Sequence, residues 1–485
     1  MRYGSGRVHV DVLIVGAGIS GIDAAYHLQT SCPRKTYAIL EARSVIGGTW
    51  DLFRYPGIRS DSDMYTLGFP FRPWRGDLSI ADGGSILAYI RETAAHYGID
   101  KKIAFDRTVI AARWSSAEAR WTVDARDSAG TIHTITCGFL FACSGYYDYA
   151  AGYTPDFPGR DRFAGTIVHP QHWPADLDYT GKRVVVIGSG ATAVTLVPEL
   201  AKRAAHVTML QRSPSYVMSL PARDRVAHWL RSKLPHRTAS SLTRWKSVLL
   251  SMGMYAYSRS YPDAMRKFLL AQVAKHTAGK VDMAHFTPSY KPWDQRLCIV
   301  PDSDLFEALK AGTASVVTDH IDTFTETGIK LRSGALLPAD IIVTATGLVL
   351  RLFGGMSLDV DGHRIDPPST MLYKGMMCSD VPNFAFATGY TNASWTLKTD
   401  LTSQFVTRLV NFMDEQGVTR AVPRRNPDVA EEPLLDFTSG YVQRSISAFP
   451  RQGSVVPWKL YQNYIRDLWV IRRARMDAPE LELTR

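Results

Sequence analysis

Two glycine-rich turns constrain the fold of this chain more than any other feature of its sequence. The first, GAGISG at residues 16–21, lies between the apolar run Val10–Val15 and a stretch with apolar residues at helical spacing. The second, GSGATA at residues 188–193, follows the apolar run Val184–Ile187 in the same way. A strand, a tight turn and a helix that leads to a second strand make a βαβ unit. The sequence therefore predicts an α/β fold with two such units.

The first turn has the pattern of a Rossmann-like dinucleotide-binding motif. Gly16 allows a sharp turn after the strand, Gly18 lets backbone amides approach a pyrophosphate, and Gly21 lets the helix pack closely on the strand. Glu41, at the end of the next strand, can accept hydrogen bonds from ribose hydroxyls but would repel a 2′-phosphate. This unit is expected to bind FAD or NAD, with a turn that serves only packing as the alternative.

The second turn carries Ala193 in place of the third glycine, which the motif permits. The strand after it ends in Gln211-Arg212-Ser213 instead of an acid. Arg212 can hold a 2′-phosphate as a planar fork, and Ser213 can add a hydroxyl donor, so this unit is expected to bind NADPH. An arginine in an ordinary surface ion pair is the alternative. The residues expected to contact this nucleotide are Gly188, Ser189, Gly190, Thr192, Ala193, Arg212 and Ser213.

The length and the remaining patterns predict how the units are joined. The 485 residues correspond to about three domain-sized units. We expect residues 1–165 to form the first part of an FAD-binding domain and residues 166–336 an NADPH-binding domain. Residues 337–485 would return to the FAD domain and add a C-terminal segment. A helix with Ser85 as N-cap and Gly98 at its end, an antiparallel meander after it, and a basic helical insertion at about 225–285 are also predicted.

Composition limits the cellular compartments and the classes of binding partner that are expected. Lys and Arg exceed Asp and Glu by 56 − 46 = +10, which suits an anionic partner: nucleic acid, a membrane surface or a phosphorylated cofactor. Because the cofactors account for part of this charge, no nucleic acid is expected. Five scattered cysteines and a short polar start predict a cytoplasmic protein. No apolar run reaches the 18 or so residues that span a bilayer, so only peripheral membrane contact stays open. The sequence does not indicate the oligomeric state.

Two dinucleotide units suggest one bound flavin and one diffusible hydride donor, as in flavoprotein reductases and monooxygenases. Disulfide reductases share this plan but need a redox cysteine pair beside the flavin. The nearest cysteines, Cys137 and Cys143, straddle a strand without that spacing. A flavin-bound redox sensor or NADPH oxidase is a third class that the turns alone allow.

The segment between the two units carries a more specific pattern. Phe163, Gly165, His169 and Trp173 are spaced as FxGxxxHxxxW, with Pro174 next. This pattern resembles the fingerprint of Baeyer–Villiger monooxygenases, which convert ketones to esters or lactones. Related N- and S-oxygenating enzymes carry an aromatic and a basic residue where this chain has Trp173-Pro174. Further segments, such as residues 47–69, 292–301 and 389–398, are similar to the subgroup of the mycobacterial ethionamide-activating monooxygenase.

The resemblance implies a mechanism and the residues that serve it. NADPH reduces the flavin, O2 adds to give a C4a-peroxyflavin, and one oxygen atom enters the ketone. By motif, Arg296 would supply a fixed positive charge to the developing anion, and Asp61 would hold its guanidinium in place. The family's histidine, His169 here, is implied in domain linkage and cofactor turnover. Oxygenation of sulfides, thioamides or amines is the alternative activity.

The resemblance also implies contacts around the flavin and the substrate. Gly47, Gly48, Thr49 and Trp50 match the loop beside the isoalloxazine ring, and Asp61 follows it. Asn392 and Trp395 are candidates to line the substrate pocket, with packing as the alternative for Trp395. Many relatives have a lysine immediately before the arginine, whereas this chain has Gln295 there. Selectivity for NADPH is therefore expected to depend more heavily on Arg212.

Overall fold

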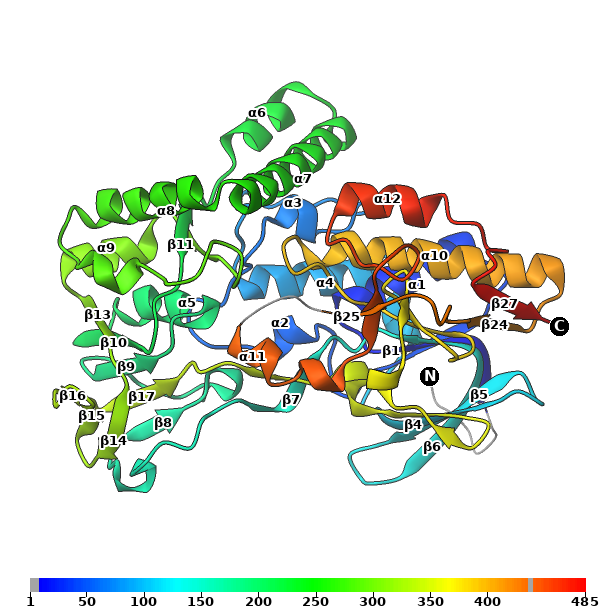
Figure 1. Ribbon diagram of the computed structural model, residues 1–485, viewed down its shortest axis with the longest axis horizontal. Coiled ribbons are helices and arrows are strands. Elements are labelled where there is room, and N and C mark those ends of the chain that lie inside the picture. The colour runs from blue at the N-terminus through cyan, green and yellow to red at the C-terminus, as the bar shows by residue number, and fades with distance from the viewer. Residues whose placement is uncertain (1–7, 435–438) are drawn as a thin grey trace.

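A computed structural model describes residues 8–434 and 439–485 of the chain (Figure 1). A larger mixed sheet and a smaller parallel sheet lie side by side, each with helices packed against it, so the predicted α/β class is confirmed. Within the described residues, no helix is both long and apolar enough to cross a membrane. All five cysteines are buried and free of disulfides.

The larger sheet is built from distant parts of the chain. Its strand order is β20-β19-β4-β5-β6-β1-β2-β3, with β23 also paired to β6. β1 runs parallel to both β2 and β6, while β4, β5 and β6 form the predicted antiparallel meander. Its strands are β1 (Val8–Val15), β2 (Tyr37–Leu40), β3 (Ile103–Ala104), β4 (Thr108–Ser115), β5 (Arg120–Arg126), β6 (Ile132–Ala142), β19 (Ser357–Val360), β20 (His363–Arg364) and β23 (Phe384–Phe386).

The smaller sheet is entirely parallel and contains the second glycine turn. Its order is β13-β10-β9-β17-β8, and a three-stranded antiparallel sheet, β14-β15-β16, follows β13 in the chain. Apolar runs such as VVVI and IIVT have the buried pattern expected of parallel strands covered on both faces. The strands are β8 (Thr166–Val168), β9 (Arg183–Ile187), β10 (His206–Gln211), β13 (Ala314–Thr318), β14 (Ile321–Thr325), β15 (Gly328–Leu331), β16 (Leu336–Pro338) and β17 (Ile341–Thr344).

The boundary predicted at residue 337 is wrong, because β17 still belongs to the smaller sheet, where it pairs with β8 and β9. The chain leaves the larger sheet through β7 (Tyr147–Gly152) and returns through β18 (Leu348–Leu350). These two strands pair with each other in antiparallel orientation, so the outgoing and returning connections lie together. The return falls after residue 344, where the apolar run of β17 has been completed.

Long helices cover the larger sheet. α1 (Ile19–Ser31) follows the first glycine turn and packs against α4 (Gly83–His96) and α10 (Trp395–Gln416). The N-cap of α4 is Asp82 and not Ser85, because the Asp82 carboxylate accepts a hydrogen bond from the Ser85 N–H at 2.9 Å. Gly98 adopts the predicted left-handed conformation just beyond the helix, with φ of 65°.

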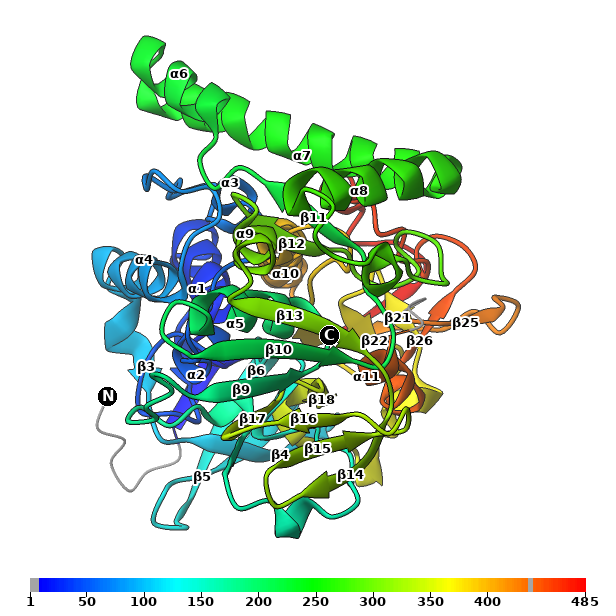
Figure 2. The ribbon, with the colours of Figure 1, turned by 90° about the vertical axis from the view of Figure 1, so that its left-hand side faces the viewer.

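The smaller unit carries α5 (Ala191–Leu200) after the second turn, and the predicted helical insertion follows (Figure 2). The insertion consists of α6 (Arg225–Lys233), α7 (His236–Ser260) and α8 (Pro262–Thr277). Shorter elements complete the chain: α2 (Thr49–Leu52), α3 (Met64–Leu67), α9 (Asp304–Ala311), α11 (Gly440–Gln443), α12 (Tyr464–Arg472), β11 (Val217–Leu220), β12 (Cys298–Pro301), β21 (Leu372–Tyr373), β22 (Met377–Cys378), β24 (Arg420–Pro423), β25 (Glu431–Pro433), β26 (Arg451–Gly453) and β27 (Leu481–Thr484).

The close approach of α1 to β1 yields a prediction about the two glycine turns. A Cβ atom at Gly21 would lie 1.9 Å from the Gly16 carbonyl oxygen, whereas one at Gly190 would meet no atom within 4 Å. Gly21→Ala should therefore destabilise the fold by about 1–3 kcal/mol, as overpacking does. Gly190→Ala, the matched control, should cost less than about 1 kcal/mol. Chemical denaturation of both variants measures this, and equal midpoints would contradict the packing role.

Candidate active site

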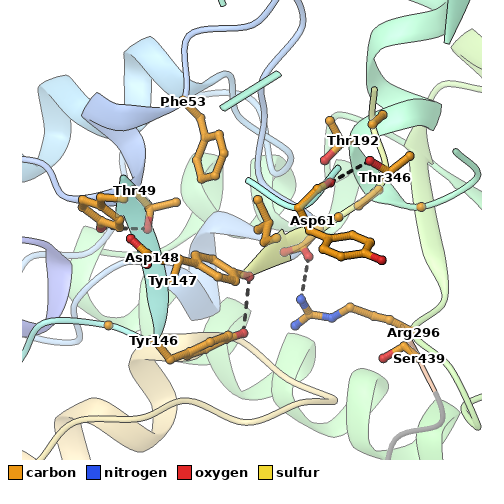
Figure 3. Close-up of a pocket in the computed structure, with 18 of the residues that line it drawn as sticks. Thr49, Phe53, Asp61, Tyr146, Tyr147, Asp148, Thr192, Arg296, Thr346 and Ser439 are labelled. Carbon is orange, nitrogen blue, oxygen red and sulfur yellow. Dashed lines mark hydrogen bonds and ion pairs between the residues drawn. The ribbon is translucent and has the colours of Figure 1, made fainter. Parts of the chain in front are cut away.

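A cavity of about 1200 Å³ lies between the two units and is lined by residues from both (Figure 3). Both glycine turns, the connections β7 and β18, and part of the C-terminal segment contribute to its wall. Most of the residues singled out from the sequence line it. They are Gly16, Gly18, Glu41, Gly47, Gly48, Thr49, Trp50, Asp61, Gly188, Ser189, Gly190, Thr192, Arg212, Ser213, Gln295, Arg296 and Trp395.

Four of the residues predicted to act in binding or catalysis lie outside the wall of the cavity. Gly21 and Ala193 sit one helical turn further along, where they pack their helices against the sheets. His169 and Asn392 are held by contacts elsewhere. The Asn392 side-chain amide donates to the Gln462 carbonyl at 2.9 Å, so the prediction that Asn392 lines the pocket is wrong.

The first turn is shaped to accept a phosphate group. Gly16 has φ of 107°, and a Cβ atom there would lie 2.6 Å from the Cys143 carbonyl oxygen, so only glycine fits. α1 begins directly after Gly18 and no side chain caps its first turn, which leaves backbone N–H groups available to an anion. These features fit a dinucleotide pyrophosphate.

Glu41 is fixed at the end of β2, as the motif requires. One carboxylate oxygen accepts a hydrogen bond from the Ala17 N–H at 2.6 Å and the other from the Arg43 N–H at 2.9 Å. Burial raises the pKa of Glu41, and these two hydrogen bonds oppose that shift. A buried acceptor in this position suits ribose hydroxyls and excludes a 2′-phosphate.

The second turn repeats the geometry of the first. Gly188 has φ of 142°, and a Cβ atom there would lie 2.3 Å from the Ala345 carbonyl oxygen at the end of β17. α5 also begins without a side-chain cap, and the space beside Gly190 is open. The same cradle for a pyrophosphate is therefore present on the second unit.

A second arginine accompanies Arg212 at this unit. Arg212 is exposed at the cavity wall after β10, while the neighbouring Gln211 is buried and donates to the His285 carbonyl at 2.7 Å. Arg444, from the C-terminal segment, also lines the cavity and stacks on the Tyr153 ring at 3.5 Å. Burial and the charge of Arg212 lower the pKa of the Arg444 guanidinium. Sequence reasoning missed Arg444, because only the fold brings residue 444 to this wall.

Asp61 and Arg296 form an ion pair across the two units. Asp61 comes from a loop of the first unit and Arg296 from the segment before β12, and Arg296 Nη1 lies 3.1 Å from Asp61 Oδ2 (Figure 3). Both side chains keep part of their surface open to the cavity, with exposed fractions of 35% and 46%. A second inter-unit pair, between Arg59 and Asp304 at the start of α9, holds the same loop. The cation and anion predicted as partners are thus brought together.

The wall near the first turn combines glycines with aromatic rings. Gly48 has φ of 55°, and Thr49 Oγ1 lies 3.3 Å from the Tyr149 hydroxyl. Tyr146 and Tyr147 bring their hydroxyl groups to 3.4 Å from each other (Figure 3). The Trp395 and Tyr146 rings lie with their centroids 5.0 Å apart and their planes tilted by 35°, and the Trp395 indole N–H donates to Ser20 Oγ at 2.8 Å. A flat aromatic cofactor would have apolar faces and hydroxyl donors around it.

His169 lies beside the two connections between the units. Its Nε2 is 3.2 Å from the Gly347 carbonyl oxygen, and its ring occupies the space that a side chain at Gly152 would need. Burial lowers the pKa of His169, which favours the neutral ring. This placement supports a role in holding β7 and β18 together and gives no contact with the cavity.

Comparison with known proteins places the chain among flavin-dependent enzymes. Residues 79–388 match the flavin-binding monooxygenase-like family, and residues 14–75 match an NAD(P)-binding Rossmann-like domain. The FAD-containing monooxygenase EthA of Mycobacterium tuberculosis is 57% identical over 480 residues, which cover 98% of each chain. EthA of Mycolicibacterium smegmatis is 54% identical and covers 98% of this chain and 97% of its own.

Solved structures with the same fold include two monooxygenases. An oxidised steroid monooxygenase bound to NADP superposes with a TM-score of 0.74, at 23% identity, over 98% of this chain and 100% of the other. An open form of cyclohexanone monooxygenase gives a TM-score of 0.75 at 20% identity, over 99% and 100%. These likenesses concern the fold.

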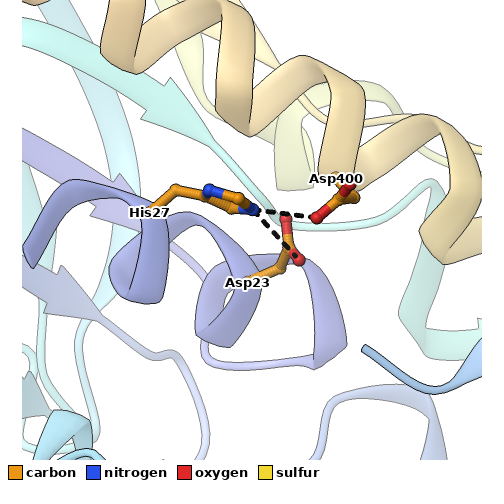
Figure 4. Close-up of side chains that lie close together, drawn as sticks. All are labelled: Asp23, His27 and Asp400. Atoms are coloured by element: carbon orange, nitrogen blue, oxygen red, sulfur yellow. Dashed lines mark hydrogen bonds and ion pairs between the residues drawn. The ribbon is translucent and has the colours of Figure 1, made fainter. Parts of the chain in front are cut away.

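Away from the cavity, three titratable side chains gather between α1 and α10 (Figure 4). His27 Nε2 lies 2.8 Å from an Asp400 oxygen and 4.0 Å from an Asp23 oxygen, and both Asp23 oxygens are buried without a hydrogen-bond partner. Burial raises the pKa of Asp23 to about 7. Burial alone would lower the pKa of His27, but the hydrogen bond with Asp400 and the charge of Asp23 raise it. The three side chains form a mostly buried cluster of titratable groups, whose ligand atoms lie within 4.8 Å of one another.

The cluster predicts how stability depends on pH. Between pH 3.8, the ordinary pKa of an aspartate, and about pH 7, Asp23 holds a proton in the folded state but has lost it in the unfolded state. The free energy of unfolding therefore falls as pH rises through this window. The Asp23→Asn variant has no titrating group at this position, so this decrease in stability should be absent from it. The difference in melting temperature, variant minus parent, should be larger at pH 8 than at pH 5 by at least about 2 °C.

Asp11→Asn serves as the matched control. Burial acts to raise the pKa of Asp11, but the hydrogen bonds with Thr36 and the charge of Lys35 together lower it, so this carboxylate is ionised at both pH values in both states. Its substitution should change the melting temperature by the same amount at each pH. An Asp23→Asn effect that does not vary with pH would show that this carboxyl group does not titrate as proposed.

Proposed function

Because this chain belongs to the flavin-binding monooxygenase-like family and groups with the FAD-containing monooxygenases named EthA, we propose that it inserts one oxygen atom of O2 into ketones to give esters or lactones. It is a flavoprotein monooxygenase whose cofactors are FAD and NADPH. The observation that carries the ketone proposal is the Asp61–Arg296 pair at a cavity between two dinucleotide turns. The FxGxxxHxxxW pattern supports the same branch of the family.

The two nucleotides are assigned by the residue that ends the second strand of each unit. The first turn with Glu41 would hold FAD, and the second turn with Arg212 would hold NADPH. When bound and reduced, FAD supplies the oxygen-activating chemistry. The cavity that both turns share allows the nicotinamide and the flavin to meet, with the glycines of residues 47–48 leaving room beside the flavin.

Arg296 is placed to stabilise negative charge on the reacting oxygen atoms. An arginine keeps its charge at any physiological pH, and the Asp61 carboxylate limits the directions in which its guanidinium can point. A fixed cation needs little reorganisation as charge develops, so it lowers the barrier more than mobile solvent does. Asp61 is in this sense a positioning residue. His169 would act through the connections β7 and β18, which set how the two units face each other.

Product analysis tests the proposed substrate class. Purified yellow protein supplied with NADPH and O2 is incubated with a panel of ketones and a panel of sulfides, thioamides and amines. We expect esters or lactones from some of the ketones. Heteroatom oxides without any ester would favour the alternative activity, and NADPH consumption with hydrogen peroxide as the product would indicate an oxidase.

Arg296→Ala should separate flavin reduction from oxygen transfer. Without the guanidinium, NADPH should still bleach the flavin in anaerobic stopped-flow measurements, whereas turnover to oxygenated product should fall by about 100-fold or more. Arg259→Ala is the matched control, since Arg259 forms a comparable ion pair with Asp294 at 2.7 Å outside the cavity. It should leave product formation unchanged. Persistent product from Arg296→Ala would refute the assigned role.

Arg212→Ala and Arg444→Ala should weaken the binding of NADPH more than that of NADH. Each variant removes a cation from the wall expected to face the 2′-phosphate, so KM for NADPH should rise by about 10- to 100-fold while KM for NADH changes little. Steady-state kinetics with both nucleotides measures this. If the two KM values rise together, the lost contact is not with the 2′-phosphate. Lys291→Ala, at an exposed position outside the cavity, should alter neither.

A further inference from the structure

The helical insertion forms an arm on one side of the molecule, and we call residues 225–277 the helical arm. In both views α6 and the adjoining end of α7 stand clear of the two sheets (Figures 1 and 2). One face of α7 packs on the body through buried Thr243, Ser247 and Val248. Two arginines fasten the arm: Arg231 donates to the Trp74 carbonyl at 2.7 Å, and Arg244 donates to the Gly68 carbonyl at 2.7 Å.

The outer face of the arm is apolar where a water-exposed helix would be polar. Nine large apolar side chains between residues 226 and 268 are exposed, among them Trp229 at 60% and Leu250 at 65%. Leu242, Trp245 and Leu249 are spaced by three and four residues, so they form one stripe along α7. An exposed apolar area of this kind on a single element is typical of a docking surface.

The charged side chains of α6 and α7 are all basic. From residue 225 to residue 262 the chain has seven Lys or Arg residues and no Asp or Glu. Arg231 and Arg244 point inward to backbone carbonyls, while Arg225, Lys233 and Arg237 are exposed at the projecting end. The surface therefore combines exposed tryptophan and leucine side chains with exposed cations.

We propose that the helical arm docks the protein on the surface of an anionic lipid bilayer. Helices that lie in the membrane interface carry Trp and Leu on one face and Lys or Arg around it. Indole rings favour the headgroup level, and each cation near an anionic leaflet adds to the attraction. Trp469 on α12 is also exposed, and α12 lies beside α7, where the Trp245 and Tyr464 ring centroids are 6.3 Å apart. It would extend the same surface.

Other occupants suit this surface less well. In a symmetric dimer the arm would pack against its own copy, which sets cations against cations with no acid within residues 225–262 to pair with them. A nucleic acid would match the charge, but the leucine stripe would remain in water. A bilayer satisfies both the charge and the apolar side chains.

Vesicle flotation tests the proposal with the FAD-loaded full chain. We expect the protein to float with phosphatidylcholine vesicles that contain phosphatidylglycerol, and to bind pure phosphatidylcholine much more weakly. Replacing two exposed apolar residues together, Trp229→Ser and Leu249→Ser, should lower the partition coefficient by about tenfold or more. A triple variant, Arg225→Gln, Lys233→Gln and Arg237→Gln, should lower it by a similar factor and reduce its dependence on salt.

Matched variants at distant exposed positions control for general changes in the surface. Two control variants should float like the parent protein. One combines Ile132→Ser with Leu336→Ser, and the other combines Lys101→Gln, Arg126→Gln and Lys182→Gln. Flavin content and NADPH-dependent flavin reduction should be unchanged in every variant, which shows that each one folds. The proposal is overturned if the arm variants float as the parent does. It is also overturned if the parent sediments as an oligomer that the arm substitutions dissociate, or if duplex DNA retains the protein while anionic vesicles do not.

Discussion

The carbonyl oxygens of Cys143 and Ala345 occupy the space that a Cβ atom would take at Gly16 and Gly188. Both oxygens follow a strand that pairs with the strand before the turn, so each glycine lets the two strand ends and the following helix meet at one point. That meeting leaves the N-termini of α1 and α5 uncapped beside a cavity. The phosphate sites that we propose for the two nucleotides depend on this close approach.

Two ion pairs and one strand pairing join the two units. Arg59 pairs with Asp304, Asp61 pairs with Arg296, and both acid–base pairs join a loop of the first unit to the second. The connections β7 and β18 pair with each other, with His169 beside them. A change in the angle between the units would therefore move Arg296 relative to the flavin site. Under the proposed function, this arrangement would let His169 influence turnover from outside the cavity.

Local patterns predicted much of this structure, and long-range contacts account for the rest. Glycine spacing, Glu41 and Arg212 are local signals, and each lies on the cavity wall as the motif requires. The C-terminal boundary of the smaller unit was misplaced because β17 looks the same in sequence whichever sheet it joins. Asn392 was misassigned because its partner, Gln462, is 70 residues away. Arg444 could not be found at all, since no local pattern predicts that it meets Arg212.

The central claim is that Arg296, held by Asp61, faces a flavin bound at the first turn while NADPH occupies the second. An experimental structure of the protein with FAD and NADP⁺ tests it most directly. We predict the Glu41 carboxylate at hydrogen-bond distance from an FAD ribose, the 2′-phosphate against Arg212, and the Arg296 guanidinium directed at the flavin ring with Asp61 still paired. Exchanged nucleotides, or an Arg296 side chain turned away from the flavin, would contradict this claim.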